Sequence, residues 1–370
     1  MRIAYLFNSS IPSGNPGSIQ VAKTCEAIIR LSNKVKLIVP NTGQKVSISN
    51  FYGLKFSPDI VRVKFFKKFP LGINYYLFSL FSVIYGINSK TDLFITRNFF
   101  TLFLLVFFNQ KAIIEIHHDL SIESRIVKFL FKNFNILNKK KVVKVIAITE
   151  SVKKYLTNDL KVNSKKIDIV PSASSLNFKF KKFSNKTRHN IGYFGSLDES
   201  KGSQFVAKMS LLDKKNNYFI FGGTKNDLKN FRIKNNCKNI NLKESVPYGK
   251  IKYYLSKMDI LLMPSNKKLL RSLGGVGNIA KYTSPLKLFD YMSSGKLIIM
   301  TNLKVFKEIV KDNKDCIMLD KLIAINWVKK IDNIKKNTKK INFIKKNVYL
   351  KSKKYTYLNR AKKILNFDSF

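Results

Sequence analysis

The chain has 370 residues, of which 45% are hydrophobic and 25% charged, which excludes a disordered or fibrous protein and leaves room for two or three domains of about 150 residues each. Lys and Arg total 69 against 22 Asp and Glu, so the net charge is +47. Such a protein is attracted to polyanions: nucleic acid, an anionic membrane surface or a phosphate-bearing substrate. AT-rich codons encode the abundant Lys, Asn, Ile and Phe, so genome composition is the simpler explanation. Without an Arg-rich arm or zinc-finger spacing, no nucleic-acid partner is expected.

The number and spacing of the cysteines indicate the redox environment of the protein. Cys25, Cys237 and Cys316 are far apart and odd in number, which excludes a disulfide framework and a Cys-rich zinc site. Scarce cysteine fits a reducing cytoplasm. The apolar run in the N-terminal sequence MRIAYLFNSS is too short for a signal peptide and predicts a first strand.

In chain order, short runs that are apolar throughout alternate with amphipathic segments. The first half predicts strands at Ile3–Phe7, Val35–Val39, Leu93–Thr96, Ala112–Ile116 and Val143–Ile148. The second half predicts strands at Ile191–Phe194, Tyr218–Phe221, Ile240–Leu242, Ile260–Met263 and Leu297–Met300, with helices such as Lys250–Met258 and Leu303–Val310 between them. Strands without polar alternation are covered on both faces, so each half is predicted to be a parallel α/β sheet.

A polar, Ser-rich and basic segment separates the two halves. We therefore expect an N-terminal Rossmann-like domain over residues 1–172, a linker over 173–189, a C-terminal Rossmann-like domain over 190–340 and a basic helical tail over 341–370. The predicted fold class is α/β, with two doubly wound parallel-sheet domains that face each other across a cleft. Ligands in such folds bind beyond the carboxyl ends of the strands.

The most apolar segments are Leu71–Ile87 and Phe99–Phe108. Polar residues interrupt the first, and the second is shorter than the roughly 20 residues of a membrane-spanning helix. We interpret both as buried helices of the N-terminal domain. A surface that dips into a membrane interface, with lysines attracting anionic lipid, is a compatible alternative.

The strongest local motif is YTSPLKLFDYMSSG. Ser284 suits the N-cap of a helix and Pro285 its first position. The free amides of such a helix start bind anions. Asp290 is expected to project back over Leu286 and Lys287, where it either accepts hydrogen bonds from ribose hydroxyls or pairs locally with Lys287.

Two further loops follow predicted strands. In IGYFGSLDESKG, Gly195 allows an unusual turn and Lys201 either neutralises a pyrophosphate or is one of many solvated lysines. The loop with Gly14 and Gly17 allows close approach of a ligand to the backbone, although it is neither a GxGxxG nor a Walker A sequence.

The sequence EIHHD also follows a predicted strand. A metal site is not expected there, because adjacent histidines on a strand point to opposite sides and the chain has only 3 histidines. One of His117 and His118 is expected to face the ligand and the other to be structural. Gly222, Pro264 and Arg97 also stand directly after predicted strands.

The segments GYFGSLDESKG, FIFGG, SKMDILLMPS and YTSPLKLFDYMSSGKLII, in this order, resemble the C-terminal domain of family 4 glycosyltransferases with the GT-B fold. VIAITESVKKYL followed by IDIVPSASS resembles the segment that closes their N-terminal domain. The resemblance implies transfer of a sugar, with retention and without a metal or other cofactor, from a nucleoside-diphosphate sugar to a glycan or lipid-linked acceptor. It places the nucleotide on the C-terminal domain and the acceptor on the N-terminal one. From the scarce cysteine, the lysine surplus and the apolar segments, we expect a cytoplasmic protein that associates peripherally with the inner face of the cell membrane.

The resemblance also implies roles for individual residues. Lys201 would contact the diphosphate, Asp290 would replace the usual ribose-binding glutamate, and His118 or His117 would lie near the sugar. The expected catalytic residues are His117, His118 and Lys201, and the expected donor-binding residues are Gly14, Gly17, Gly195, Ser196, Lys201, Gly222, Pro264, Ser284, Pro285, Leu286, Lys287 and Asp290. Ser196 stands where the family often has an arginine.

Two alternatives remain open from the sequence. One is a sugar-nucleotide epimerase on the same architecture, which would need carboxylates placed for proton transfer. The other is a non-catalytic polyanion-binding protein with a degraded ancestral site, for which steep salt dependence of nucleic-acid binding is expected.

Overall fold

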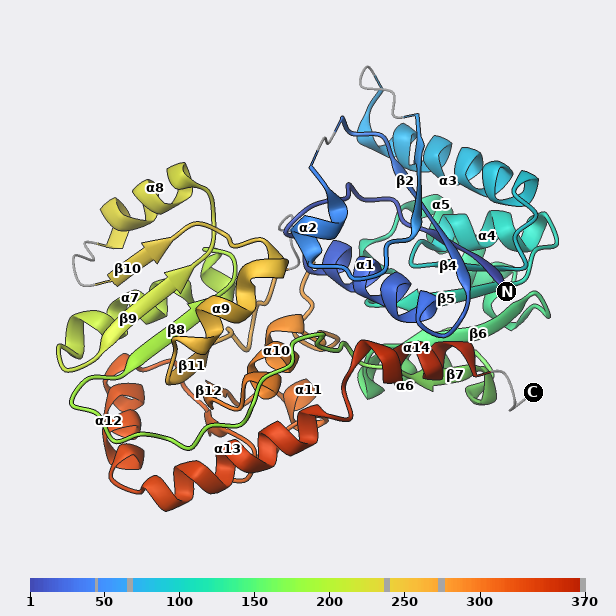
Figure 1. Ribbon diagram of the computed structural model, residues 1–370. Coiled ribbons are helices and arrows are strands. Elements are labelled where there is room, and N and C mark those ends of the chain that lie inside the picture. Colours follow the sequence, from blue (N-terminus) through green and yellow to red (C-terminus); the bar gives the residue numbers. More distant parts are fainter. Residues whose placement is uncertain (44–45, 65–68, 236–239, 272–276, 367–370) are drawn as a thin grey trace. The chain divides into compact units, whose positions relative to one another are not determined.

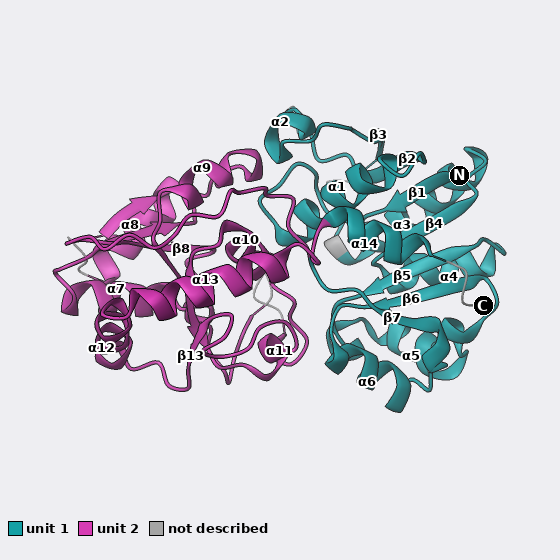
Figure 2. Ribbon diagram, turned by 60° about the horizontal axis from the view of Figure 1, so that its bottom comes forward, with its two compact units in different colours: residues 1–172, 357–370 teal, residues 173–356 magenta. Residues whose placement is uncertain are grey.

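The computed structural model, shown in Figure 1, describes residues 1–43, 46–64, 69–235, 240–271 and 277–366. Cys237 and the last four residues of the expected tail, 367–370, lie outside the described residues. The chain divides into two compact units (Figure 2): unit 1 is Met1–Ser172 with Tyr357–Phe370, and unit 2 is Ala173–Thr356. Each unit is built around one parallel β-sheet.

Unit 1 contains a 7-stranded sheet in the order β3-β2-β1-β4-β5-β6-β7. Its strands are β1 Arg2–Leu6, β2 Lys34–Pro40, β3 Asp59–Val63, β4 Leu93–Thr96, β5 Ala112–Ile116, β6 Val142–Ala147 and β7 Ile167–Ile169. The five strands predicted from the sequence are confirmed within one residue at each end. The two strands that were missed, β3 and β7, are the sheet edges. They carry charged residues such as Arg62 and Asp168, which hide the apolar pattern of a buried strand.

The helices of unit 1 fill the connections between its strands. They are α1 Pro16–Ile29, α2 Ile48–Tyr52, α3 Leu71–Asn88, α4 Phe99–Phe107, α5 Arg125–Asn133, α6 Glu150–Asn158 and α14 Tyr357–Leu365, with short 3₁₀ turns at Leu120–Ile122, Ile136–Asn138 and Ser164–Lys166. Side-chain caps fix the N-termini of three helices. Asn98, Ser124 and Thr149 accept a hydrogen bond from a first-turn amide of α4, α5 and α6, respectively.

Unit 2 contains a 6-stranded sheet in the order β10-β9-β8-β11-β12-β13. Its strands are β8 Asn190–Phe194, β9 Asn217–Phe221, β10 Ile240–Lys243, β11 Ile260–Met263, β12 Leu297–Thr301 and β13 Ile317–Leu319. Its helices are α7 Ser203–Leu212, α8 Lys225–Asn235, α9 Ile251–Ser256, α10 Leu286–Ser294, α11 Lys304–Lys307, α12 Ala324–Lys335 and α13 Thr338–Ser352, with 3₁₀ turns at Glu199–Lys201 and Tyr248–Lys250. All five predicted strands are present, whereas β13 was missed.

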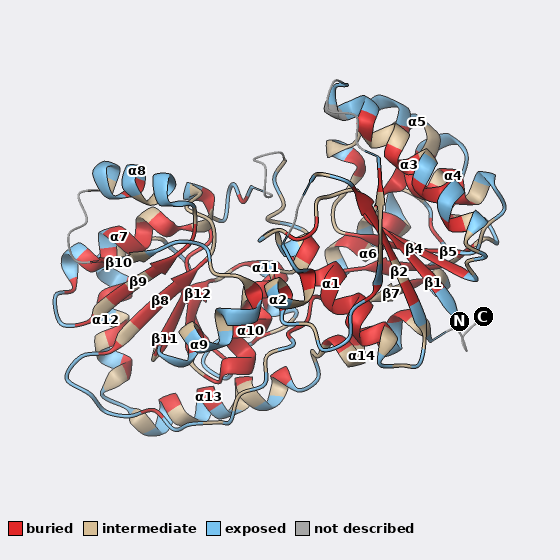
Figure 3. Cartoon of the chain, turned by 45° about the horizontal axis from the view of Figure 1, so that its top comes forward, coloured by how far each residue is buried: buried red, intermediate tan, exposed pale blue. Residues whose placement is uncertain are grey.

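The core of unit 2 lies on both faces of its sheet. One apolar cluster joins α7 and α12 to the sheet and includes Trp327, which is fully buried. The other joins α9, α10 and α11 to the opposite face and includes Phe289 and Met292. Figure 3 shows the central strands of both units as buried, which explains why they carry no polar alternation.

Four expected elements differ from the structure. The helix expected at Lys250–Met258 is a 3₁₀ turn followed by a six-residue α9, and the one expected at Leu303–Val310 is the four-residue α11. The segment expected as a linker belongs to unit 2. The expected tail is divided, because α13 packs on α10 in unit 2 whereas α14 packs on α1 in unit 1.

Both sheets reverse their strand order at a defined point. In unit 1 the chain winds outward in both directions from β1 and β4, and in unit 2 from β8 and β11. The loops at the carboxyl ends of these strand pairs diverge, and ligands bind in the crevice that this creates. No helix within the described residues is long and apolar enough to span a bilayer.

Candidate active site

Glycine loops meet at the strand-order reversal of unit 2. A Cβ on Gly222, after β9, would lie 1.8 Å from the carbonyl oxygen of Gly195, after β8. A Cβ on Gly202 would lie 2.0 Å from the carbonyl oxygen of Pro264, after β11, and Gly202 has a φ of +85°. The structure therefore brings the expected donor-binding positions Gly195 and Gly222 into contact and places Pro264 against Gly202, and glycine is what lets these backbones approach.

Two lysines lie beside this group. Lys287, in the first turn of α10, would be 2.7 Å from a Cβ on Gly195, and its amine stands 4.5 Å from the centre of the Tyr193 ring. Its Nζ is buried and has no hydrogen-bond partner within the described part of the chain. Burial lowers the pKa of Lys287 to about 7, and the nearby Lys201 adds to this effect.

Lys201 ends the 3₁₀ turn Glu199–Lys201, just before α7. Burial lowers the pKa of Lys201 to about 8, while Asp198 acts in the opposite direction. Neither Lys201 nor Lys287 forms an ion pair with any described residue. Lys201 lowers the proton affinity of Lys287, and a buried pair of lysines without an ion-pair partner among the described residues forms a site that favours an anion.

The start of α10 differs from the expected one. Pro285 has φ −74° and ψ 127°, which is extended backbone, so it is the N-cap and Leu286 is the first helical residue. Ser284 thus lies one position outside the cap, and the N-cap residue Pro285 makes no side-chain hydrogen bond to the helix. The expectation of Ser284 as N-cap was wrong because Pro285 keeps an extended ψ.

Asp290 is buried, with an exposed fraction of 3%. Its Oδ1 accepts a hydrogen bond from the hydroxyl of Ser174 at 2.6 Å and from that of Tyr248 at 2.9 Å. The alternative of a local pair with Lys287 is wrong, since the Lys287 amine has no partner among the described residues. Sequence reasoning missed Ser174 and Tyr248 as partners of Asp290, because they are 116 and 42 positions away from it in the chain.

At the strand-order reversal of unit 1, Arg97 reaches the glycine loop. Arg97 follows β4, and its Nη1 donates to the carbonyl oxygen of Gly17 at 3.3 Å. The same Nη1 would be 3.1 Å from a Cβ on Gly17, whereas a Cβ on Gly14 would meet open space. The structure therefore places Gly17 and Arg97, but not Gly14, in direct contact.

A buried charge network lies at the same edge. Tyr5 donates to Oε1 of Glu115 at 3.1 Å, and Arg360 of α14 donates to Oε2 at 2.7 Å. Although burial would raise the pKa of Glu115, Arg360 and then His117 and Arg97 bring it down to about 2. No local signal marks Glu115 and Arg360 as a pair, because 245 positions separate them.

The two histidines lie in different environments. His117 Nε2 is 3.4 Å from Oε2 of Glu115, and burial, with Arg97 second, lowers the pKa of His117 to about 3. His118 instead pairs its Nδ1 with the carbonyl oxygen of Asp119 at 2.7 Å and faces Glu123 at 3.7 Å. Of the two, His117 is the one beside Arg97. The described residues contain no group of three potential metal-ligating side chains.

Residues 188–337 match the family model described as glycosyl transferases group 1, and no curated protein sequence matches the chain. HepE of Anabaena in complex with UDP-glucose is similar in structure, with 13% identity, a TM-score of 0.69 and coverage of 98% of both chains. Sucrose-phosphate synthase of Thermosynechococcus elongatus has 14% identity, a TM-score of 0.71 and coverage of 98% of this chain and 96% of that one. A glycosyltransferase of Rickettsia africae has 15% identity, a TM-score of 0.70 and coverage of 99% and 98%.

The two sheets and their strand orders define an α/β protein with two Rossmann-like units, the GT-B fold that these structures share. The family match falls on unit 2, the unit with the paired lysines and the glycine loops. Unit 2 thus matches the glycosyl transferases group 1 family over residues 188–337, and the chain as a whole has the GT-B fold.

Proposed function

We propose that the protein transfers a sugar from a nucleoside-diphosphate sugar bound at the strand-order reversal of unit 2 to a glycan or lipid-linked acceptor bound by unit 1. The observation that carries the proposal is the pair of lysines, Lys201 and Lys287, which have no ion-pair partner in the described structure. A diphosphate supplies the missing negative charge. The HepE structures contain UDP, alone or as UDP-glucose, so UDP-sugars are the first donors to test.

The main catalytic contribution is electrostatic. As the bond between the sugar and the diphosphate breaks, negative charge accumulates on the leaving phosphate oxygens. Lys201, Lys287 and the free amides of the first turn of α10 are already in place around that charge, so they stabilise the transition state without reorganisation. This proposal needs no metal ion or other cofactor, and the anomeric configuration is retained.

Asp290 is proposed to bind the ribose. A carboxylate has about four acceptor positions, so the hydrogen bonds from Ser174 and Tyr248 leave capacity for ribose hydroxyls. These two donors also fix the orientation of the carboxylate, which makes it a rigid acceptor. In unit 1, Gly17, Arg97 and His117 are proposed to contact the acceptor, with His117 neutral because of its lowered pKa.

The test is calorimetric titration of UDP and a panel of UDP-sugars, together with a product assay. Lys201→Ala is expected to weaken UDP binding by about tenfold or more, since one charge-assisted contact contributes roughly 1.5–3 kcal/mol. Lys208→Ala is the matched control, because Lys208 is exposed on α7 of the same unit. Equal UDP binding by wild type and Lys201→Ala would overturn the donor-site assignment.

The product assay separates the proposal from its alternatives. A glycosyltransferase forms a sugar–acceptor product and releases UDP. An epimerase interconverts nucleotide sugars without an acceptor. A polyanion-binding protein shows steeply salt-dependent binding to nucleic acid and no turnover.

We further propose that the protein works in the cytoplasm and associates peripherally with an anionic membrane through unit 1, in polysaccharide or cell-envelope glycan synthesis. The two apolar segments are the helices α3 and α4, as predicted, but each buries only part of its surface. The side chain of Phe107 on α4 is 72% exposed, and those of Phe129 on α5 and Phe134 just after it are 59% and 51% exposed. Lys132 and Arg125 are exposed on α5, so apolar and basic groups share this surface.

Sedimentation with vesicles tests the membrane proposal. Binding is expected to rise with the anionic lipid fraction and to fall with salt. Phe107→Ser with Phe129→Ser should weaken it, whereas Ile233→Ser, which changes an equally exposed apolar side chain of unit 2, should not. Equal binding by all three proteins would contradict the proposed surface.

A further inference from the structure

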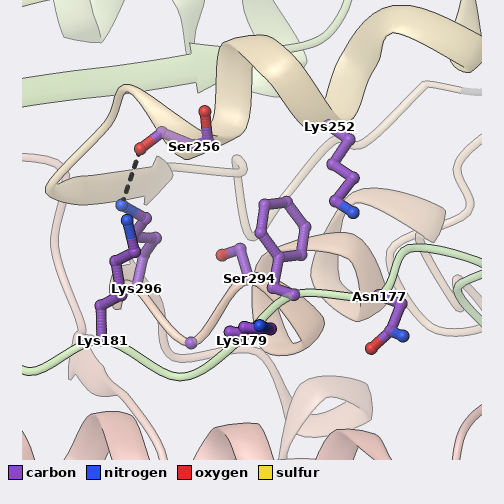
Figure 4. Close-up of a pocket in the computed structure, with 9 residues that line it drawn as sticks. Asn177, Lys179, Lys181, Lys252, Ser256, Ser294 and Lys296 are labelled. Carbon is purple, nitrogen blue, oxygen red and sulfur yellow. Dashed lines mark hydrogen bonds between the residues drawn. The ribbon is translucent and has the colours of Figure 1, made fainter.

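A second basic site lies on unit 2, away from the lysines described above. It is a cavity of about 400 Å³ lined by Asn177, Phe178, Lys179, Lys181, Lys252, Ser256, Ser294, Gly295 and Lys296. Four of these residues are lysines and none is acidic. The lysines come from the segment before β8, from α9 and from the turn between α10 and β12 (Figure 4).

The position of this lysine cavity separates it from the proposed donor site. Ser256 ends α9 just before β11, and Lys296 directly precedes β12, so the cavity lies at the amino ends of these strands. The glycine loops and Lys201 lie at their carboxyl ends. β11 has 4 residues, and at ~3.3 Å per residue the two ends are about 13 Å apart.

The charges of the lysine cavity are not neutralised from inside the protein. Lys296 Nζ donates to the carbonyl oxygen of Ser256 at 3.0 Å, which satisfies a hydrogen bond but supplies no negative charge. Asp259, the acid that acts on Lys296, is already ion-paired with Lys186 at 2.9 Å. Burial lowers the pKa of Lys296, and Lys186 and Lys181 add to that effect against Asp259.

Helix ends offset part of this charge. The C-termini of α9 and α10 both reach the cavity at Ser256 and Gly295. Each helix C-terminus contributes about half an elementary negative charge at most, which is small against four lysines. The cavity therefore remains strongly cationic.

The shape of the cavity limits what it can bind. A volume of about 400 Å³ is at the small end of ligand sites. The Phe178 ring forms an apolar wall, with Lys252 Nζ 5.6 Å from its centre. Lysines bind phosphate as flexible point charges and do not require the planar geometry of a guanidinium site.

We propose that this lysine cavity is a second anion site that binds a phosphate-bearing group with at least two negative charges, independently of the donor nucleotide. The phosphate group belongs either to a soluble phosphorylated molecule or to an anionic lipid headgroup. Both sources present the same chemistry to the four lysines.

Two titrations distinguish the sources. In the first, inorganic pyrophosphate is titrated by calorimetry into protein already saturated with UDP, which occupies the proposed donor site. In the second, vesicles of phosphatidylcholine with or without phosphatidic acid replace pyrophosphate. Each uses wild type, the cavity variant Lys179→Gln/Lys181→Gln/Lys252→Gln, and the control variant Lys208→Gln/Lys225→Gln/Lys229→Gln. All six changed lysines are exposed on unit 2, so both variants lose equal charge without a core contact.

The cavity variant is expected to bind pyrophosphate about tenfold more weakly than wild type, with the control unchanged. If only binding to phosphatidic acid vesicles is lost in the cavity variant, the group belongs to a lipid. Equal weakening in the cavity and control variants, or no binding of either probe by wild type, would overturn the proposal. UDP binding is measured first, without pyrophosphate or vesicles. A failure of the proposed donor site is therefore seen separately from a failure of the lysine cavity.

Discussion

The two sheets have similar strand orders, but the charged residues at their carboxyl edges are arranged differently. At the edge of unit 1, the buried carboxylate of Glu115 pairs with Arg360 and lies close to His117. At the edge of unit 2, Lys201 and Lys287 have no ionic partner within the described residues. The carboxylate at the first, closed edge has its counter-charge within the protein, whereas the lysines at the second, open edge have none among the described residues. The same topology thus supports a structural charge network in one unit and the proposed donor site in the other.

The largest expected effect tests the closed edge. Arg360→Ala leaves Glu115 buried without its main counter-charge, and breaking a buried pair from one side costs about 3–5 kcal/mol of unfolding free energy. Urea denaturation measures the loss. Lys362→Ala, at an exposed position of the same helix, should change stability by less than about 0.5 kcal/mol. Similar losses in the two variants would mean that the Glu115 network does not stabilise unit 1.

Substitution of Asp290 tests whether the buried carboxylate of unit 2 binds the nucleotide or only stabilises the fold. Asp290→Ala removes the acceptor for Ser174 and Tyr248, so both the stability and the UDP affinity should fall, each by about 1.5–3 kcal/mol, or roughly ten- to a hundredfold in binding. Thermal denaturation and calorimetry measure the two effects.

Tyr248→Phe is the control for Asp290→Ala, because it removes one donor but keeps the carboxylate. It should lower stability and largely preserve UDP binding. Asp290→Glu should retain UDP binding. If Asp290→Ala is less stable but binds UDP like wild type, Asp290 is purely structural and resembles Glu115.

Alanine substitutions of two glycines compare how tightly the backbone is packed in the two units. Gly222→Ala places a Cβ 1.8 Å from a backbone oxygen, and a forced backbone shift costs about 1–3 kcal/mol. Gly14→Ala meets no atom within 4 Å and should change stability by less than about 0.5 kcal/mol. Denaturation of the two variants side by side tests this, and equal stability would show that the loops of unit 2 are not tightly packed.

The smallest expected effect is a pH dependence of the open edge. Folding lowers the pKa of Lys287 to about 7 and that of Lys201 to about 8, whereas a bound diphosphate favours their protonated forms. Binding therefore takes up protons above these pKa values, and UDP affinity should fall as pH rises from 7 to 9, by up to about tenfold per pH unit for each proton taken up. Calorimetry in buffers of different ionisation enthalpy measures the uptake. Lys201→Arg, which stays charged, should flatten the profile, and an unchanged profile would contradict the role of Lys201.

The structural features that were predicted correctly from the sequence are those that depend on residues close together in the chain. The central strands were correct because they are buried on both faces and read as uninterrupted apolar runs. Gly195, Gly222 and Pro264 were identified by their place after those strands. The edge strands β3 and β7 of unit 1 were missed because they carry charged residues such as Arg62, whereas β13 is apolar but only 3 residues long.

The remaining features depend on contacts between distant parts of the chain. No spacing links Asp290 to Ser174 and Tyr248, or Glu115 to Arg360. The tail reads as a solvated lysine-rich helix, yet four side chains of α14 at helical spacing are buried: Tyr357, Arg360, Ala361 and Ile364. Such partners are fixed only when tertiary packing brings the segments together.

The return of α14 to unit 1 has a consequence for protein synthesis. A ribosome releases residues 1–172 long before Arg360, so the nascent sheet holds the Glu115 carboxylate without its partner while unit 2 is being made. Lys144 beneath α14 already has an ion pair with Asp168 at 2.8 Å, but the carbonyl oxygens of Lys363 and Asn366, to which its amine also donates, arrive only with the C-terminal segment. Unit 1 is therefore translated first but completed last, because it needs α14. Unit 2 is translated second but can finish folding before α14 is made.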